Sequence, residues 1–200
     1  GHSVMSCQEW TDLKDELQRA EEFQGEAHIA LEEVRKSKSA SLEEWSLRCG
    51  DLEERLRSLL ERDGQLKIKT AATSQALHEE WELLSLVRSV REKLGRVNAV
   101  MGEDSANEPV MDFREVTLFV NHLTQAAEKH SEFGLLRTLV NDMIAVHSAA
   151  SNWNERAVGL LPQKATRNKT KPDAAQATTD DLLAALSEPV ARAVVTPMHE

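Results

Sequence analysis

The histidines are the residues of this chain that could do chemistry, and their spacing argues against it. His78-Glu79-Glu80-Trp81 begins like the helical two-histidine zinc motif, but that motif needs a second histidine one turn later, where Glu82 stands. His122, His130 and His147 lie on different helical turns, with no second Cys or His at ligand spacing. The sequence also lacks a Gly-x-Ser-x-Gly motif and a glycine-rich phosphate loop. We therefore expect no catalytic residue, no metal site and no cofactor, and hence no enzyme.

Composition and charge narrow the classes of partner. The 200 residues include 34 acidic and 24 basic side chains, which gives a formal net charge of −10. Because phosphate affinity comes from Lys and Arg, we expect no general binding of nucleic acid. The apolar content of 40 % is too high for a disordered chain, and no apolar run is long enough to span a bilayer.

The two cysteines indicate the cellular compartment of the protein. Cys7 and Cys49 lie too far apart, on either a continuous helix or a hairpin, for a disulfide. Two free thiols favour a reducing compartment, so we expect an intracellular protein of the cytoplasm or nucleus, with an extracellular surface as the alternative.

Apolar residues recur in steps of three and four along five segments, which predicts helices with coiled-coil seams. In the third segment consecutive steps of three around Val87 break the heptad, so we expect overwinding or a change of packing partner there. Capping boxes open the first segment at Ser6 and the second at Ser41, and a similar pattern opens the fourth at Asp112. The third runs from about Thr73 to Gly102, and Pro162 ends the fifth. We expect an all-α fold, an elongated antiparallel helical bundle or coiled coil. The seam and core residues expected to be buried are Trp10, Leu13, Leu17, Trp45, Leu52, Leu56, Leu59, Trp81, Leu84, Val120, Leu123, Met143 and Trp153. Gln24 also falls on a seam, where we expect it to fix the register.

Four segments organise the chain. Residues 1–5 are a flank that starts like an expression remnant, 6–161 form the bundle, 162–177 form a flexible basic linker, and 178–200 carry a short amphipathic tail helix. An eight-residue helix needs a surface on which to bury its leucines. That surface is either the bundle's own end or a partner's groove. The candidate partner-binding residues are Leu182, Leu183 and Leu186.

Spacing also indicates a tandem two-helix repeat. Trp10, Trp81 and Trp153 are separated by 71 and 72 residues, and each is followed by a capping pattern, at Ser41, Asp112 and Thr178. Duplication of a two-helix unit would produce this pattern, and so would an accidental coincidence of seam tryptophans.

The same residues carry a family resemblance. The capped Ser41-Leu42-Glu43-Glu44, the leucine-rich helix after it and Trp81 on the next helix resemble the all-helical region of JARID-type JmjC histone demethylases. The resemblance covers residues 41–160 and rests on helical spacing. The chain has neither the iron-binding His/Asp/Glu motif nor the zinc-binding cysteines of that family, so the resemblance implies no catalytic residue.

These patterns predict a non-enzymatic helical scaffold or protein-interaction module, a rigid spacer within a larger intracellular assembly. Its partners would be unidentified proteins, and the chain itself would be a monomer or weak dimer. The alternatives are an extracellular or cell-surface helical receptor or adhesin, and an accessory helical region of a chromatin-modifying enzyme, as the resemblance implies.

Overall fold

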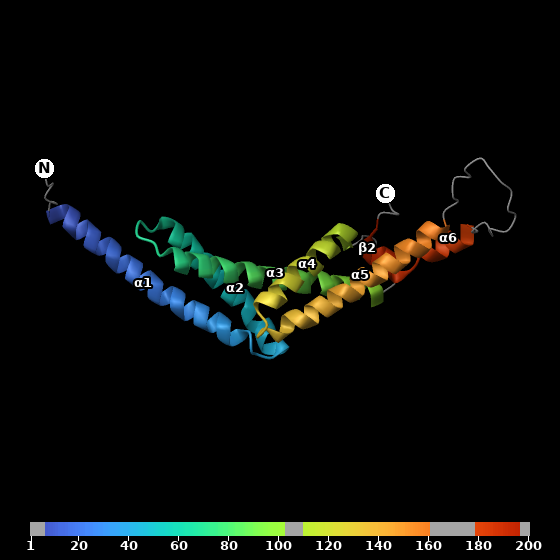
Figure 1. Cartoon of the computed structure of the whole chain (residues 1–200), viewed down its shortest axis with the longest axis horizontal. Helices are drawn as coiled ribbons and strands as arrows, with labels where there is room; N and C mark the ends of the chain where they lie inside the picture. The colour runs from blue at the N-terminus through green and yellow to red at the C-terminus, as the bar shows by residue number, and fades with distance from the viewer. Residues whose placement is uncertain (1–6, 103–109, 161–178, 197–200) are drawn as a thin grey trace. The chain divides into compact units, whose positions relative to one another are not determined.

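The computed structural model describes residues 7–102, 110–160 and 179–196, and these ranges are almost entirely helical (Figure 1). The predicted all-α fold is confirmed. The helices of the described ranges are α1 (Cys7–Ser37), α2 (Leu42–Gln65), α3 (Ala71–Gly102), α4 (Phe113–Lys129), α5 (Gly134–Leu160), α6 (Thr179–Leu186) and α7 (Pro189–Ala193).

Side-chain caps set the beginnings of two helices where the sequence predicts them. The Ser41 hydroxyl accepts a hydrogen bond from the Glu44 N–H at the start of α2, at 3.3 Å. Asp112 does the same for the Glu115 N–H at the start of α4, at 2.7 Å. Each oxygen satisfies a backbone donor that the first helical turn leaves unpaired. The predicted caps at Ser6 and Thr178 lie outside the described residues.

The chain divides into two compact units, a division that the heptad pattern does not reveal. Unit 1 contains the chain up to Arg88 together with residues 130–135, the turn between α4 and α5. Unit 2 contains the rest of α3 and α4, α5 from Leu136, and the described part of the tail. The predicted linker 162–177 lies outside the described residues.

In unit 1, α1 and α2 pack as an antiparallel hairpin, and the α1 seam differs from the predicted one. Gln24, which is predicted to lie on the seam, is exposed and donates a hydrogen bond to the Thr70 hydroxyl. Leu31, one heptad after Gln24 on the same line, is half-buried. The buried residues again follow steps of three and four, but on a neighbouring face: Ala20, Phe23, Ala27, Ala30, Val34 and Ser37. Three alanines on this face let α2 approach closely. On α2 the prediction is accurate from the second seam position onward, with Trp45, Cys49, Leu52, Leu56 and Leu59 buried.

In unit 2, a short parallel strand pair ties the tail to the start of α4. β1 (Met111–Asp112) pairs with β2 (Val194–Val195), and the Val110 N–H donates to the Ala193 carbonyl at 2.9 Å. Met111 and Val194 are buried. The predicted single tail helix is therefore incomplete: beyond α6 the tail turns through α7 into a strand. Lys93 joins α3 to the same region, donating to the Val110 carbonyl at 3.2 Å and pairing with Glu115 at 3.1 Å.

The predicted core residues divide into three groups. Those that are buried are Trp45, Leu52, Leu56, Leu59, Leu84, Leu123, Met143 and Trp153, and those that are half-buried are Trp81 and Val120. Trp10, Leu13 and Leu17 are exposed, so their predicted burial is wrong. The physical reason is length. The pairing of α1 with α2 places Gln65, the last residue of α2, level with Phe23, and α1 continues for more than a dozen residues beyond it.

Candidate interaction surfaces

The N-terminal part of α1, residues 7–19, is the most exposed apolar segment of unit 1, and we call it the α1 tip. Trp10 is 63 % exposed, Leu13 is 44 % exposed and Leu17 is 48 % exposed. Their spacing of three and four residues places them on one face of the helix over about 10 Å. No residue of the tip is buried by the described part of the chain. A single exposed leucine, such as Leu47 on α2, is ordinary, whereas three large apolar side chains on one face indicate a contact surface.

The buried stripe of α1 continues into the tip. Going back from Ala20 in the same steps of four and three leads to Glu16, Leu13 and Glu9. Trp10 and Leu17 border this line. The tip therefore presents apolar side chains beside carboxylates. They lie on the continuation of the α1 face that α2 covers nearer the C-terminus of α1.

Three ion pairs join α1 to the segment packed against it, and in each the carboxylate belongs to α1. Arg55 pairs with Glu33 and Arg62 pairs with Glu26. A third pair joins Lys67, in the connection after α2, to Glu16 at 3.4 Å. In all three pairs α1 supplies the carboxylate and the segment packed against it supplies the cation.

The Glu26–Arg62 pair gives a testable pH dependence. The hydrogen bond from Arg62 lowers the pKa of Glu26, against a smaller opposing effect of burial. Because the folded-state pKa lies below the unfolded one, roughly 4.3, the pair stabilises the hairpin above that pH and the contribution is lost as the pH falls through the folded value. Glu26 is half exposed, so we expect Glu26→Gln to cost no more than about 1 kcal/mol at neutral pH. Urea unfolding should show this difference at about pH 7 and a smaller one at about pH 3; an equal difference at both would contradict the assignment.

A buried ionic cluster lies at the other end of the hairpin. Lys38, in the turn after α1, has a side chain only 4 % exposed. Its ammonium group donates to Glu80 Oε1 at 2.8 Å and contacts His130 Nδ1 at 3.3 Å, with Glu132 Oε1 at 3.9 Å. Next to this cluster in unit 1, the rings of Trp45 and Phe133 pack at 5.8 Å. The cluster joins α3 and the turn 130–135 to the α1–α2 hairpin.

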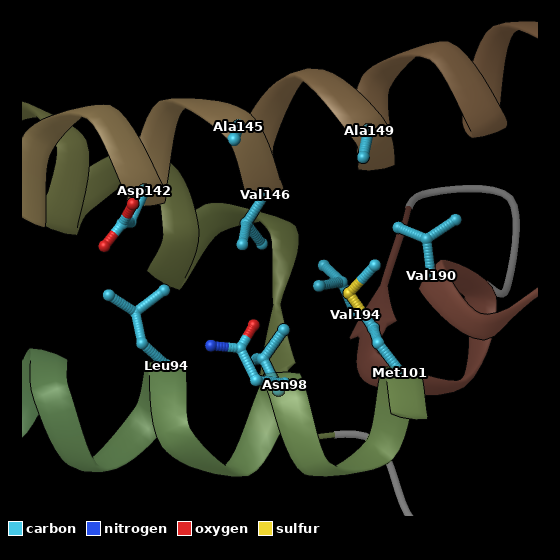
Figure 2. A pocket seen from close by; sticks show the side chains of 10 residues that line it. Leu94, Asn98, Met101, Asp142, Ala145, Val146, Ala149, Val190 and Val194 are labelled. Atoms are coloured by element: carbon cyan, nitrogen blue, oxygen red, sulfur yellow. The ribbon is translucent and has the colours of Figure 1, made fainter. Parts of the chain in front are cut away.

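Unit 2 contains an apolar groove between α3 and α5, shown in Figure 2. Its volume is about 420 Å³, and α7 and β2 close one end with Val190 and Val194. Leu94 and Val97 form buried parts of its wall, while Asn98 of α3 and Asp142 of α5 bring the polar groups. The volume falls in the range of small-ligand pockets, but catalysis needs convergent reactive groups and this lining has none.

The tail lies on α5, and two of its three predicted contact leucines, Leu183 and Leu186, are exposed. The Trp153 indole N–H donates to the Ala185 carbonyl at 2.7 Å, and Arg156 makes a bidentate pair with Glu188 at 3.0 and 2.7 Å. The hydrogen bonds from Arg156 to Glu188 raise the pKa of Arg156. Ala185 is the buried contact of α6, whereas Leu183 is 59 % and Leu186 is 44 % exposed; the side chain of Leu182 lies outside the described residues.

The histidines that the sequence singles out are separate from one another. His78 pairs with Glu82 on its own helix at 3.1 Å, His122 is exposed, and His147 stacks on Phe113 at 4.7 Å. Among the described residues, no group of three or more His, Cys, Asp or Glu side chains is placed to hold a metal ion. Cys7 is exposed and Cys49 is buried, and neither forms a disulfide.

Comparisons with protein-family models, curated proteins and solved structures found no match for this chain. Over the ranges that the structure describes, no helix is long and apolar enough to cross a membrane.

Proposed function

We propose that this protein is a non-enzymatic helical interaction module, a rigid spacer or scaffold within a larger intracellular assembly, which docks a partner protein on the α1 tip. The observation that carries the proposal is the exposure of Trp10, Leu13 and Leu17 on one helix face beyond the end of α2. Keeping this much apolar surface in water is unfavourable, at about 25 cal/mol per Å², so covering it supplies binding energy. Tryptophan is also among the residues that most often dominate protein–protein contacts.

The geometry of α1 suits a spacer. The helix has 31 residues, which corresponds to about 46 Å at 1.5 Å per residue, and its C-terminal half is held by α2 and by the Lys38 cluster. A partner bound at the tip would therefore be kept at a defined distance from that cluster. The intracellular part of the proposal is supported by the two cysteines, which form no disulfide and of which Cys7 is exposed.

The experiment compares proteins retained from an extract of the source cells by four forms of the full chain. These are the wild type, Leu13→Asp/Leu17→Asp, the matched control Leu47→Asp, and Leu183→Asp/Leu186→Asp on the tail. All substituted residues are exposed, so we expect unchanged circular dichroism and melting temperature.

We expect the wild type and the control to retain a partner protein in stoichiometric amount. The tip variant should retain more than tenfold less of it, because two buried carboxylates would disrupt an apolar contact. Loss with the tail variant alone would move the contact to α6. The same proteins bound by all four forms would refute docking through either surface.

A further inference from the structure

In the ion pairs along α1, the helix supplies the carboxylates and its neighbour supplies the cations, and this indicates which kind of helix the tip can bind. The pairs Glu33–Arg55, Glu26–Arg62 and Glu16–Lys67 follow one another toward the N-terminus of α1. Beyond Glu16 the tip carries further carboxylates, at Glu9, Asp12 and Asp15, and one cation, Lys14. Arg19, the other cation of the tip, pairs with Glu16 within α1 at 3.2 Å. Glu9 also lies on the continuation of the buried stripe. One heptad before Glu26 stands Arg19, and one heptad before that a carboxylate returns at Asp12. Around Asp12 the surface beyond the end of α2 therefore again combines apolar side chains with carboxylates.

From this we infer, on the basis of the proposed function, that the partner of the α1 tip is an amphipathic helix whose apolar face is bordered by Lys and Arg, bound in line with α2. Its apolar residues would cover Trp10, Leu13 and Leu17, and its cations would pair with Glu9 and Asp12. Tip residues 7–19 span about 20 Å, so about two heptads of the partner would be in contact.

A second copy of this chain is a poorer occupant. Glu16 is already paired with Arg19 and Lys67, but pairing two tips would still bring together two sets of three further carboxylates, those of Glu9, Asp12 and Asp15. Like charges opposite one another across an interface disfavour the complex. Each tip has one further cation, Lys14, to set against its three carboxylates.

The test uses two designed helical peptides of about three heptads with the same leucine seam. One carries lysine at every position flanking the seam and the other carries glutamate, so that like charges keep each peptide from pairing with itself. Binding of the labelled peptides to the full chain is measured by fluorescence anisotropy at about 0.15 M and about 0.5 M salt.

We expect the lysine peptide to bind at least tenfold more tightly than the glutamate peptide, with a smaller ratio at the higher salt concentration because salt screens exposed charges. Leu13→Asp/Leu17→Asp should weaken the binding of the lysine peptide more than tenfold, whereas Leu47→Asp should leave its affinity unchanged. The added aspartates make the chain more acidic, so this loss separates docking on the tip from non-specific attraction to a chain of net charge −10. Glu9→Lys/Asp12→Lys should reduce the preference between the peptides several-fold while leaving the apolar stripe intact.

Other outcomes separate the inference from the proposed function. The glutamate peptide could bind as tightly as the lysine peptide, or more tightly, and lose this binding with Leu13→Asp/Leu17→Asp. That result would refute a partner bordered by Lys and Arg but would keep the tip as a docking surface. Lysine-peptide binding that is unaffected by Leu13→Asp/Leu17→Asp would overturn the tip as its site. A dimer of the chain that forms through the tip and excludes the peptide would make a second copy the occupant and overturn the inference.

Discussion

Replacing Trp153 with alanine is expected to lower the free energy of unfolding by about 3–5 kcal/mol. The side chain is 1 % exposed, and its indole N–H holds the carbonyl of Ala185, so the substitution removes both a large packed ring and the contact that joins α6 to α5. Trp153→Phe keeps most of the ring and should cost less, with about 1 kcal/mol arising from the lost hydrogen bond. Denaturant unfolding followed by circular dichroism measures both.

Trp10→Ala is the matched control for this prediction. Trp10 occupies the corresponding place in the predicted 71-residue repeat, yet it is 63 % exposed. Its replacement should change the free energy of unfolding by no more than about 0.5 kcal/mol, as at other surface positions. Similar large losses for both tryptophans would show that the tip is buried in solution and would contradict the exposed stripe.

The second large effect concerns the ionic cluster of unit 1. Lys38→Met is expected to cost about 3 kcal/mol, because it removes the cation that compensates Glu80 in a largely buried site. Glu80 depends on this cation: its Oε1 is held by Lys38, and its buried Oε2 has no hydrogen-bond partner among the described residues. The loss should appear in denaturant unfolding at neutral pH.

The double variant Lys38→Met/Glu80→Leu separates charge from packing. Replacing both members of a buried ion pair with apolar residues is often neutral, so we expect the double variant to recover most of the stability that Lys38→Met loses. A double variant that is less stable than Lys38→Met would show that Glu80 stabilises unit 1 independently of Lys38.

Helix positions were predictable from the sequence because they depend on neighbours in the chain. The heptads, the cap at Ser41 and the stop at Gly102 are local signals. The start of α2, both ends of α3 and the end of α5 lie within a few residues of the predictions. The face that each helix buries was less predictable, because it depends on the partner. Along α1 the spacing of Gln24 and Leu31 fits a seam as well as that of Phe23 and Ala30, and only the position of α2 decides between them.

The contacts between distant segments were not predictable. From the sequence, Lys38 is a cation near the C-terminal end of α1, where a positive charge is favourable. Only the fold places Glu80, His130 and Glu132 around its ammonium group. The pairing of β1 with β2 joins two-residue segments more than 80 residues apart, with no alternation long enough to detect. The exposed stripe has a partial signal in the sequence, since α1 is seven residues longer than α2, which leaves Trp10 and Leu13 without a place on that helix. The exposure of Leu17 depends on the register, which places Gln65 level with Phe23, and this was not predictable.

Hydrogen–deuterium exchange of the full chain with and without the lysine peptide is the measurement that most directly tests whether the α1 tip is the docking surface. Without the peptide, the amides of residues 7–19 should exchange quickly, because the described chain buries none of these residues. With the peptide, protection should appear in residues 7–19 and leave the groove around Leu94 and Val146 and the exposed face of α6 unchanged. Protection in the groove or on α6, with none in residues 7–19, would contradict the α1 tip as the docking surface.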